Sequence, residues 1–349
     1  MKIRILSGRC SRTEKPVSAM QFCCLFILLV AASPTSWTLI IDDHEIEPYP
    51  HPQIPNCYSL RRNAASPTTI HCLPSVLVAG FPKCGTSALY GFLELHPSTI
   101  GTRHKEYCIR GNENLVDYLR GLPGPQEING KVLISGCLLF ETLREIVRLK
   151  PDSLKVLIII REFAERSWAA YNFWCYPEVE TCEKDSDWAT KNNYRSPEMF
   201  NEIVLAQDRN ISLKLWFPSL LLEAPDFYQS RISRYTDIIP QQDLHIIDSK
   251  QLESSPEVVW KGISDFLNLP LLISSSHPRI EVFRSRRYNT QNHKGEDNFQ
   301  SSRGYQSQLY PISGNRPMLP KTREILNAHW GPDCLWLKET YHLTSLNVC

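Results

Sequence analysis

The sequence has almost no net charge, no internal repeat and only one long apolar run. Its 38 lysines and arginines are balanced by 37 aspartates and glutamates, so the formal net charge is only +1. A chain without a basic surface overall is not suited to binding nucleic acid, and any anion must be bound by a local cluster. No repeat divides the 349 residues, whose length and 42% hydrophobic content suit a globular enzyme of one large domain or at most two.

The one long apolar segment covers residues 17–32 and follows a basic leader. Positive charge ahead of a single apolar segment predicts a cytosolic tail over residues 1–16 and a translocated remainder. The segment has 16 residues, fewer than the ~20 of a typical membrane span. We interpret it as a signal anchor, which gives a single-pass type II membrane protein, or as a signal peptide cleaved near Ala31–Ser33, which gives a secreted protein.

Cysteine usage agrees with an oxidising compartment. The chain has 12 cysteines, and nine of them follow the apolar segment. This number is ordinary in the secretory pathway and high for the cytosol, and an odd count leaves at least one thiol without an intrachain bridge. We expect Cys84 to be the free thiol. The candidate bridges closest in sequence are Cys57–Cys72 and Cys175–Cys182.

Composition divides the translocated part of the chain in two. Residues 33–74 are rich in proline and predict an extended stem. From residue 75 to residue 349, strand-like apolar runs alternate with helical patterns, which predicts an α/β fold of the P-loop type, with three layers and a central parallel sheet flanked by helices. The expected strands cover residues 76–79, 132–134, 156–160 and 244–247, and one expected helix begins at Ser255–Pro256.

The first of these strands is followed by residues 80–87, Gly-Phe-Pro-Lys-Cys-Gly-Thr-Ser, and then by a helix-like segment. A buried strand, a turn with glycines and a helix start together predict a loop that holds a phosphate with its backbone N–H groups. In an ATP- or GTP-binding loop a lysine follows the second glycine. Here Thr86 follows Gly85 and Lys83 precedes it, so the pattern is not that of a nucleotide-triphosphate loop; the alternative is an ordinary turn.

This loop resembles the 5′-phosphosulfate loop of sulfotransferases, which bind 3′-phosphoadenosine 5′-phosphosulfate (PAPS). The resemblance implies that PAPS is the co-substrate and that no metal is required. It also implies that the 5′-phosphosulfate is bound by Lys83, Cys84, Gly85, Thr86 and Ser87.

A second motif begins where the strand over residues 156–160 ends. Arg161 follows this strand and opens a helix, where its guanidinium is well placed to bind a phosphate; the alternative is a salt bridge at the helix end. Sulfotransferases carry an arginine here and a serine eight residues later, both contacting the 3′-phosphate. Arg161 matches this pattern, but position 169 is alanine. Ser167 comes two residues early and points about 200° away on a helix.

The third motif, residues 103–107, supplies candidate bases. Golgi carbohydrate sulfotransferases carry a Lys-Glu-Pro-His-like stretch at this position. Lys105-Glu106 match its first pair, whereas Tyr107-Cys108 stand in place of the Pro-His. The resemblance implies that Glu106 accepts the proton of the acceptor hydroxyl, while Lys83 stabilises the charge on the leaving oxygen. His104 is a competing base, because its ordinary pKa suits proton transfer near neutrality. A solvated charged loop is the alternative.

The C-terminal part of the chain carries weaker signals. Residues 317–323 resemble the entry to the last helix in enzymes of the N-acetylgalactosamine 4-sulfate 6-O-sulfotransferase type, which also carry Pro-Lys-Cys-Gly-Thr in the first loop. Residues 289–295 resemble the loop that closes over the 3′-phosphate and adenine, with Lys294 and Gly295 as candidate ligands.

The whole pattern predicts a sulfotransferase of the Golgi membrane that moves a sulfuryl group from PAPS to a hydroxyl of a carbohydrate acceptor. The possible glycosylation site at Asn210 suits a lumenal domain. A catalytically silent binding protein on the same fold is the main alternative, supported by Ala169. A P-loop kinase is a weaker one, because Thr86 and Arg161 stand where such an enzyme needs a lysine and a carboxylate. The acceptor sugar and the oligomeric state stay open.

Overall fold

The computed structural model describes the following residues: 2–4, 38–41, 43–63, 65–102, 105–109, 115–136, 140–149, 154–174, 197–208, 227–271 and 317–343. The expected membrane segment over residues 17–32, the bridge candidate Cys175–Cys182 and the sequon at Asn210 lie outside them. None of the helices within these ranges is long and apolar enough to cross a membrane.

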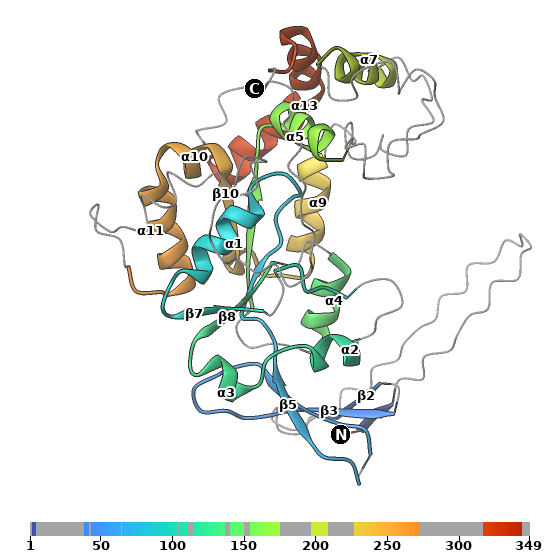
Figure 1. Cartoon of the computed structure of the whole chain (residues 1–349), viewed down its shortest axis with the longest axis vertical. Coiled ribbons are helices and arrows are strands. Elements are labelled where there is room, and N and C mark those ends of the chain that lie inside the picture. Colours follow the sequence, from blue (N-terminus) through green and yellow to red (C-terminus); the bar gives the residue numbers. More distant parts are fainter. Residues whose placement is uncertain are drawn as a thin grey trace, which may run out of the picture.

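A five-stranded parallel sheet forms the centre of the molecule, as the sequence predicts (Figure 1). Its strand order is β10-β9-β6-β8-β7, and all its pairings are parallel. The strands are β6 (Val76–Val78), β7 (Thr99–Gly101), β8 (Val132–Ser135), β9 (Lys155–Ile160) and β10 (Leu244–Asp248). The last five residues of β9 are all buried, which is the reason for its continuous β-branched run.

Helices cover both faces of this sheet and complete the three layers. On one face, α1 (Thr86–Glu94) packs on α11 (Pro256–Leu267) through the Phe92 and Trp260 rings, whose centroids lie 4.5 Å apart. On the other face, α4 (Phe140–Arg148) packs on α9 (Phe227–Thr236) through Phe140 and Tyr235. The long C-terminal helix α13 (Pro320–Tyr341) contacts α9, α5 (Phe163–Trp174) and α7 (Pro197–Asp208). The expected start of α11 at Pro256 is confirmed.

A second sheet differs from the extended stem that the prolines predict over residues 33–74. It is antiparallel from β2 to β5 and lies at one end of the molecule (Figure 1). Its strands are β2 (Thr38–Ile41), β3 (His44–Pro48), β4 (Cys57–Arg61) and β5 (Thr69–Cys72). The described prolines of this segment lie at the end of β3 and in the connections between strands, which are positions that a sheet tolerates.

This antiparallel sheet packs on the rest of the fold. Ile46 and Leu60 are buried in the main hydrophobic core, and the Tyr58 hydroxyl donates to the carbonyl of Leu149, at 2.9 Å. The Cys72 N–H donates to the carbonyl of Pro123, which leads into the short helix α3 (Pro125–Ile128). We therefore describe residues 38–72 as part of the folded body.

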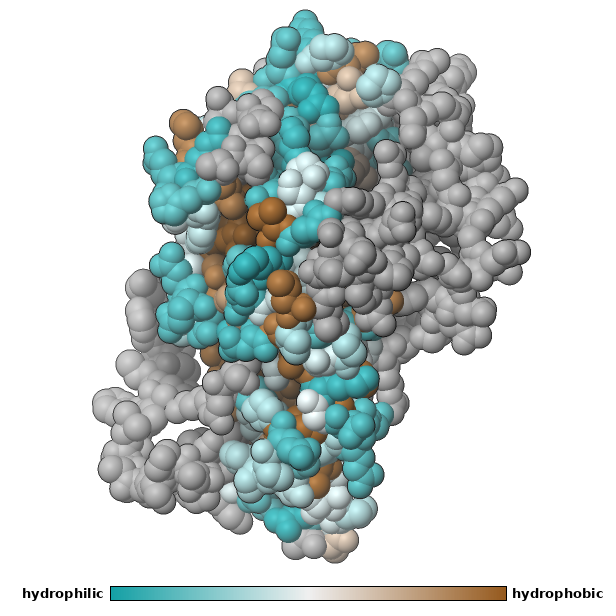
Figure 2. Space-filling model, turned by 90° about the vertical axis from the view of Figure 1, so that its left-hand side faces the viewer, coloured by the Kyte–Doolittle hydropathy of each residue, from teal (hydrophilic) through white to brown (hydrophobic). Residues whose placement is uncertain are grey.

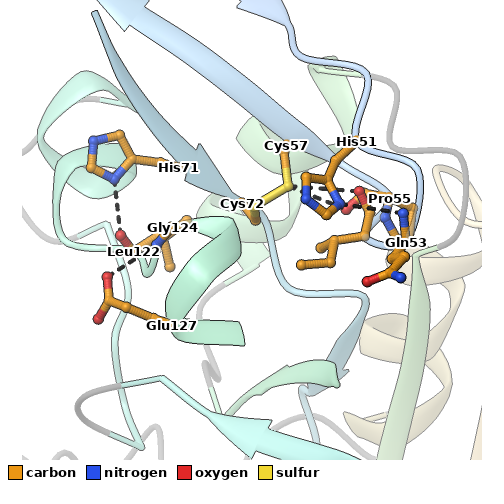
Figure 3. The surroundings of a disulfide bond; sticks show 10 residues. His51, Gln53, Pro55, Cys57, His71, Cys72, Leu122, Gly124 and Glu127 are labelled. Carbon is orange, nitrogen blue, oxygen red and sulfur yellow. Dashed lines mark hydrogen bonds between the residues drawn. A yellow bond between two sulfur atoms is a disulfide. The ribbon is translucent and has the colours of Figure 1, made fainter. Parts of the chain in front are cut away.

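The predicted bridge between Cys57 and Cys72 is confirmed and joins β4 to β5 (Figure 3). Beside it, His71 hydrogen-bonds the carbonyl of Leu122, so β5 is held to the segment before α3. Cys84 is a free and buried thiol, as expected.

The remaining elements include β1 (Lys2–Arg4), which pairs in parallel with β2 and so lies beside residues 38–40. The others are α2 (Leu115–Arg120), the 3-10 turn Gln241–Asp243 and α10 (Ser249–Ser254). On the side of the molecule that carries α10 and α11 in Figure 1, the surface is mostly hydrophilic with scattered hydrophobic patches (Figure 2).

Candidate functional site

The candidate site lies at the carboxyl ends of β6 and β9, the two central neighbours of the parallel sheet. After β6 the chain crosses by α1 to β7 on one side of the sheet, whereas after β9 it continues to β10 on the other side. The loops that leave these strands therefore diverge, which makes this the topological switch point where open α/β sheets bind ligands. Residues 80–87 follow β6 and Arg161 follows β9, so both predicted phosphate motifs meet at this point.

The loop over residues 80–85 turns tightly and runs close to β9. A Cβ atom on Gly80 would lie 2.3 Å from the backbone nitrogen of Ile159, so no larger residue fits there. Gly85 has a φ of 102°, and Lys83 has a φ of 69°. A positive φ costs a glycine little but is uncommon for a lysine, so the loop holds the Lys83 backbone in a conformation of higher energy.

Helix α1 starts at Thr86 without the usual capping groups. Its N-cap residue is Gly85, no side chain accepts a hydrogen bond at the cap, and the first turn contains no acidic residue. The first N–H groups of a helix have no intrahelical partner and carry the positive end of the helix dipole. The start of α1 is therefore a suitable anion site.

Lys83 is half-buried beside this helix start. Burial and the positive charge of Lys105 lower the pKa of Lys83 to about 7, and Glu106 opposes this shift. The ammonium would gain an anionic partner readily, because an opposite charge restores its charged form. Lys83 thus fits the cation that the sequence predicts for a leaving oxygen.

Glu106 and its neighbour Lys105 lie at the opening of the loop. The Lys105 ammonium donates to the Ser87 hydroxyl at 2.6 Å, and it lies 3.4 Å from both the Thr86 hydroxyl and the Glu106 carboxylate. The Glu106 side chain is 52% exposed. A solvent-facing carboxylate beside two lysines can accept a proton from a substrate that binds at this opening.

Arg161 reaches across from β9 to the loop. One of its guanidinium nitrogens lies 3.5 Å from the carbonyl of Lys83, and another lies 3.4 Å from the Glu165 carboxylate. Glu165 also pairs with Arg323 at the start of α13, whose guanidinium contacts Glu162 at 2.8 Å as well. The Arg161 side chain is 35% exposed, so it remains accessible to a bound anion.

Glu165 and Ala169 lie one helical turn apart on the same face of α5, and Arg161 precedes this helix by two residues. Ser167 is fully buried on another face of the helix, as expected from its register. The hydroxyl that the sulfotransferase motif places eight residues after the arginine is therefore missing from this face.

Several residues that shape the site carry no signal in the sequence. The Tyr228 hydroxyl of α9 donates to the carbonyl of Arg161 at 2.6 Å and lies 3.6 Å from the Cys84 sulfur. The Cys84 thiol is turned inward, and burial raises its pKa. Its contact with Tyr228 helps to hold the loop in place. The Asp333 carboxylate of α13 accepts the backbone N–H groups of Tyr228 and Gln229, at 2.5 and 2.9 Å. Tyr228 lies 67 residues after Arg161 and 144 after Cys84, and Asp333 lies 105 residues after Tyr228.

Three predicted site residues, His104, Lys294 and Gly295, lie outside the described part of the chain. Among the residues that the structure describes, no cluster of three or more histidine, cysteine or acidic side chains could hold a metal ion. The donor set brought together here, two lysines, an arginine and an uncapped helix start, suits a phosphate or sulfate group.

Sequence comparison finds relatives among enzymes of glycosaminoglycan sulfation. The chain is 27% identical over 256 residues to a bifunctional heparan sulfate N-deacetylase/N-sulfotransferase of Drosophila melanogaster, covering 65% of this chain and 23% of that protein. It is 24% identical over 232 residues to the mouse heparan sulfate glucosamine 3-O-sulfotransferase 5, covering 62% and 61%. The chain thus spans less than two thirds of either relative.

Comparison with solved structures finds a sulfotransferase of Alicyclobacillus acidocaldarius, with a TM-score of 0.48 and 17% identity over 78% of this chain and 96% of that one. The mouse sulfotransferase SULT7A1 complexed with PAP matches with a TM-score of 0.45 and 15% identity, over 77% and 88%. No protein-family profile matches the chain. The sequence relatives confirm the resemblance to carbohydrate sulfotransferases, but not the narrower one to N-acetylgalactosamine 4-sulfate 6-O-sulfotransferase.

Proposed function

We propose that this protein is a sulfotransferase that moves a sulfuryl group from PAPS to a hydroxyl of a carbohydrate chain. The observation that carries the proposal is the meeting of Lys83, Arg161 and Glu106 around one uncapped helix start, at the carboxyl ends of β6 and β9. This reaction needs cations that bind the two phosphates of PAPS and a base beside them. The sequence relatives support the same reaction class.

PAPS supplies an activated sulfuryl group when it is bound, and the side chains of this chain do the rest. Glu106 accepts the proton of the acceptor hydroxyl as the hydroxyl oxygen attacks sulfur. The bond between sulfur and the bridging oxygen breaks, and Lys83 stabilises the negative charge that this oxygen gains. 3′,5′-ADP leaves, and the acceptor carries the sulfate ester. His104 remains the alternative base.

The proposal extends to the other end of the co-substrate. Arg161 would bind the 3′-phosphate, and Lys294 and Gly295 would cover it together with the adenine. Ala169 in place of serine favours the second candidate, a silent protein that binds the nucleotide without transferring sulfate. An experiment therefore has to separate binding from transfer.

Titration of the full-length protein with 3′,5′-ADP and, in parallel, with ATP and Mg²⁺ tests the nucleotide site. We expect 3′,5′-ADP to bind and ATP with Mg²⁺ to bind much more weakly. Preference for ATP would support a kinase instead, and binding of neither would contradict the proposed function.

Transfer is tested with labelled PAPS and defined acceptors. We propose a glycosaminoglycan acceptor, because the sequence relatives are named for heparan sulfate. Heparan-type and chondroitin-type chains, with a neutral glycan as control, would identify the class. If 3′,5′-ADP binds but no acceptor is sulfated, the silent-protein candidate is favoured.

The variant Glu106→Gln separates the two steps. Because the amide keeps the size of the side chain but cannot accept the proton, we expect transfer to fall by at least about a hundredfold. Affinity for 3′,5′-ADP should stay within a fewfold of the wild type. Full activity in this variant would transfer the role of base to His104.

We also propose that residues 17–32 anchor the protein in the Golgi membrane, with residues 1–16 in the cytosol. A protease-protection assay on an N-terminal epitope tests this topology, and cleavage of the epitope in intact vesicles is expected. A protected epitope would contradict the anchor and would agree instead with the pairing of β1 and β2, which needs both strands on one side of a membrane.

A further inference from the structure

Lys105 is a basic residue that contacts the start of α1 and has no assigned part in the proposed reaction. Its ammonium lies 2.6 Å from the Ser87 hydroxyl and 3.4 Å from the Thr86 hydroxyl, on the first turn of α1. We propose that Lys105 is a second cation of the 5′-phosphosulfate site and that it orients both hydroxyls toward the bound anion. The inference rests on the proposed function and adds a binding residue to it.

The chemistry of the contact supports this role. An ammonium group can only donate hydrogen bonds, whereas a hydroxyl both accepts and donates. When Ser87 and Thr86 accept from Lys105, their own protons point away from it and become available to an acceptor at the start of α1. That position is where the uncapped N–H groups of the helix also point. Lys105 thus adds its positive charge and directs two further donors to the same place.

The position of Lys105 is fixed by β8. The backbone carbonyl of Lys105 accepts the N–H of Gly136, which follows β8, at 2.8 Å. A Cβ atom on Gly136 would lie 2.7 Å from the Cγ atom of Lys105, so the glycine leaves the space that the lysine stem occupies. The side chain is only 20% exposed. A lysine held in this way is preorganised for an anion.

A salt bridge with Glu106 does not account for this arrangement. The Lys105 and Glu106 charges lie 3.4 Å apart, and the carboxylate is 52% exposed, so the pair adds little stability. Burial also lowers the pKa of Lys105, which Glu106 only partly offsets. A buried charge that an exposed partner does not stabilise well is better explained by an anionic ligand.

The test compares two nucleotides in the full-length protein. 3′,5′-ADP carries a 5′-phosphate, whereas adenosine 3′-phosphate lacks it, so Lys105 should matter only for the first. We expect Lys105→Met to weaken binding of 3′,5′-ADP by about ten- to a hundredfold, the range for a hydrogen bond to a charged group. Binding of adenosine 3′-phosphate should not change. Lys261→Met, on the exposed face of α11, is the matched control and should affect neither.

The outcomes are distinct. Equal losses for both nucleotides would show a structural role for Lys105, and no loss for either would remove it from the site; both results overturn the inference. If the wild type fails to bind 3′,5′-ADP, the proposed function itself fails. Partial recovery of 3′,5′-ADP binding in Lys105→Arg would support a role for the positive charge.

The pH dependence gives an independent readout. Among the residues that the structure describes, the charged groups around Lys83 include Lys105 and Glu106 from the segment over 105–109 and Arg161 from the end of β9. Removing the positive charge of Lys105 should raise the pKa of Lys83. The pH above which 3′,5′-ADP affinity declines should therefore move upward in Lys105→Met and stay in place in Lys261→Met. An unchanged midpoint would contradict the proximity of the two ammonium groups in solution.

Discussion

At the scale of single residues, Lys83 combines burial, a positive φ and a neighbouring positive charge. Its pKa of about 7 in the folded protein lies well below the ~10.4 of a lysine in an unfolded chain. Between these two values the folded state binds fewer protons, so stability should rise with pH across this range. At pH 7 and below, the protonated side chain destabilises the empty protein.

We therefore expect Lys83→Met to abolish transfer and yet to raise the melting temperature by a few degrees near neutral pH. The gain should be largest below pH 7 and should shrink as the pH rises toward 10, because folding then requires the loss of a proton that the unfolded chain holds less and less tightly. Thermal unfolding at several pH values measures this directly. A variant that is less stable than the wild type at low pH would contradict the assigned pKa.

Ala169 offers a second prediction at this scale. It lies one helical turn after Glu165 on the same face of α5 and eight residues after Arg161, where a serine would present a hydroxyl. We expect Ala169→Ser to strengthen 3′,5′-ADP binding by about three- to tenfold, as one added hydrogen bond allows. ADP, which has no 3′-phosphate, is the matched ligand and should bind unchanged. Equal affinities of variant and wild type for 3′,5′-ADP would place the 3′-phosphate elsewhere.

The residues of the site differ in how far the sequence reveals them. Lys83, Gly85 and Arg161 follow buried strands, and their spacing alone brings them together. Tyr228 and Asp333 reach the site from α9 and α13, so only the tertiary fold reveals their contacts. Lys105 belongs to the motif over residues 103–107, but its contact with Ser87 depends on how β8 and the following Gly136 hold it.

At the scale of elements, α9 and α13 together position the backbone of Arg161. The Asp333 carboxylate accepts two N–H groups at the start of α9, and Tyr228, one of the two donors, holds the carbonyl of Arg161. Asp333 is fully buried, so its hydrogen bonds exchange little with water. It acts as an N-terminal cap supplied by another helix.

We expect Asp333→Asn to lower the free energy of unfolding by about 1–3 kcal/mol, because one buried N–H loses its acceptor. Affinity for 3′,5′-ADP should also fall, since Tyr228 shifts with the start of α9. Asp237→Asn, at an exposed position just after α9, is the control and should be close to neutral. Chemical denaturation and titration of both variants measure the two effects; unchanged stability in Asp333→Asn would contradict the capping role.

The strands also differ in predictability. β8, β9 and β10 were expected because buried parallel strands need continuous apolar runs. The three-residue edge strand β7 was missed, because so short a segment has no period. The antiparallel strands β2 to β5 were missed for another reason: prolines between short strands give the same composition as a stem.

At the scale of the whole molecule, the antiparallel sheet decides where the folded body begins. A stem could be removed without loss, whereas this sheet contributes Ile46, Tyr58 and Leu60 to the main core. Within this sheet, the disulfide between Cys57 and Cys72 joins two residues that are 15 positions apart in the sequence. In the chain-entropy model, a disulfide that closes a loop of this size stabilises the folded state by about 3 kcal/mol.

A chain that begins at residue 75 should therefore fold poorly, while a chain that begins at residue 38 should behave like the full-length protein. Removing the sheet exposes the surface that the three core side chains cover, and the burial of one large apolar side chain stabilises the fold by about 1.5–3 kcal/mol. It also removes the hydrogen bond that Tyr58 donates to the Leu149 carbonyl. Thermal unfolding and 3′,5′-ADP titration of both chains measure the difference. The sheet lies at the end of the molecule away from α13 (Figure 1). If the chain that begins at residue 75 kept full stability and full affinity, residues 38–72 would be a dispensable stem.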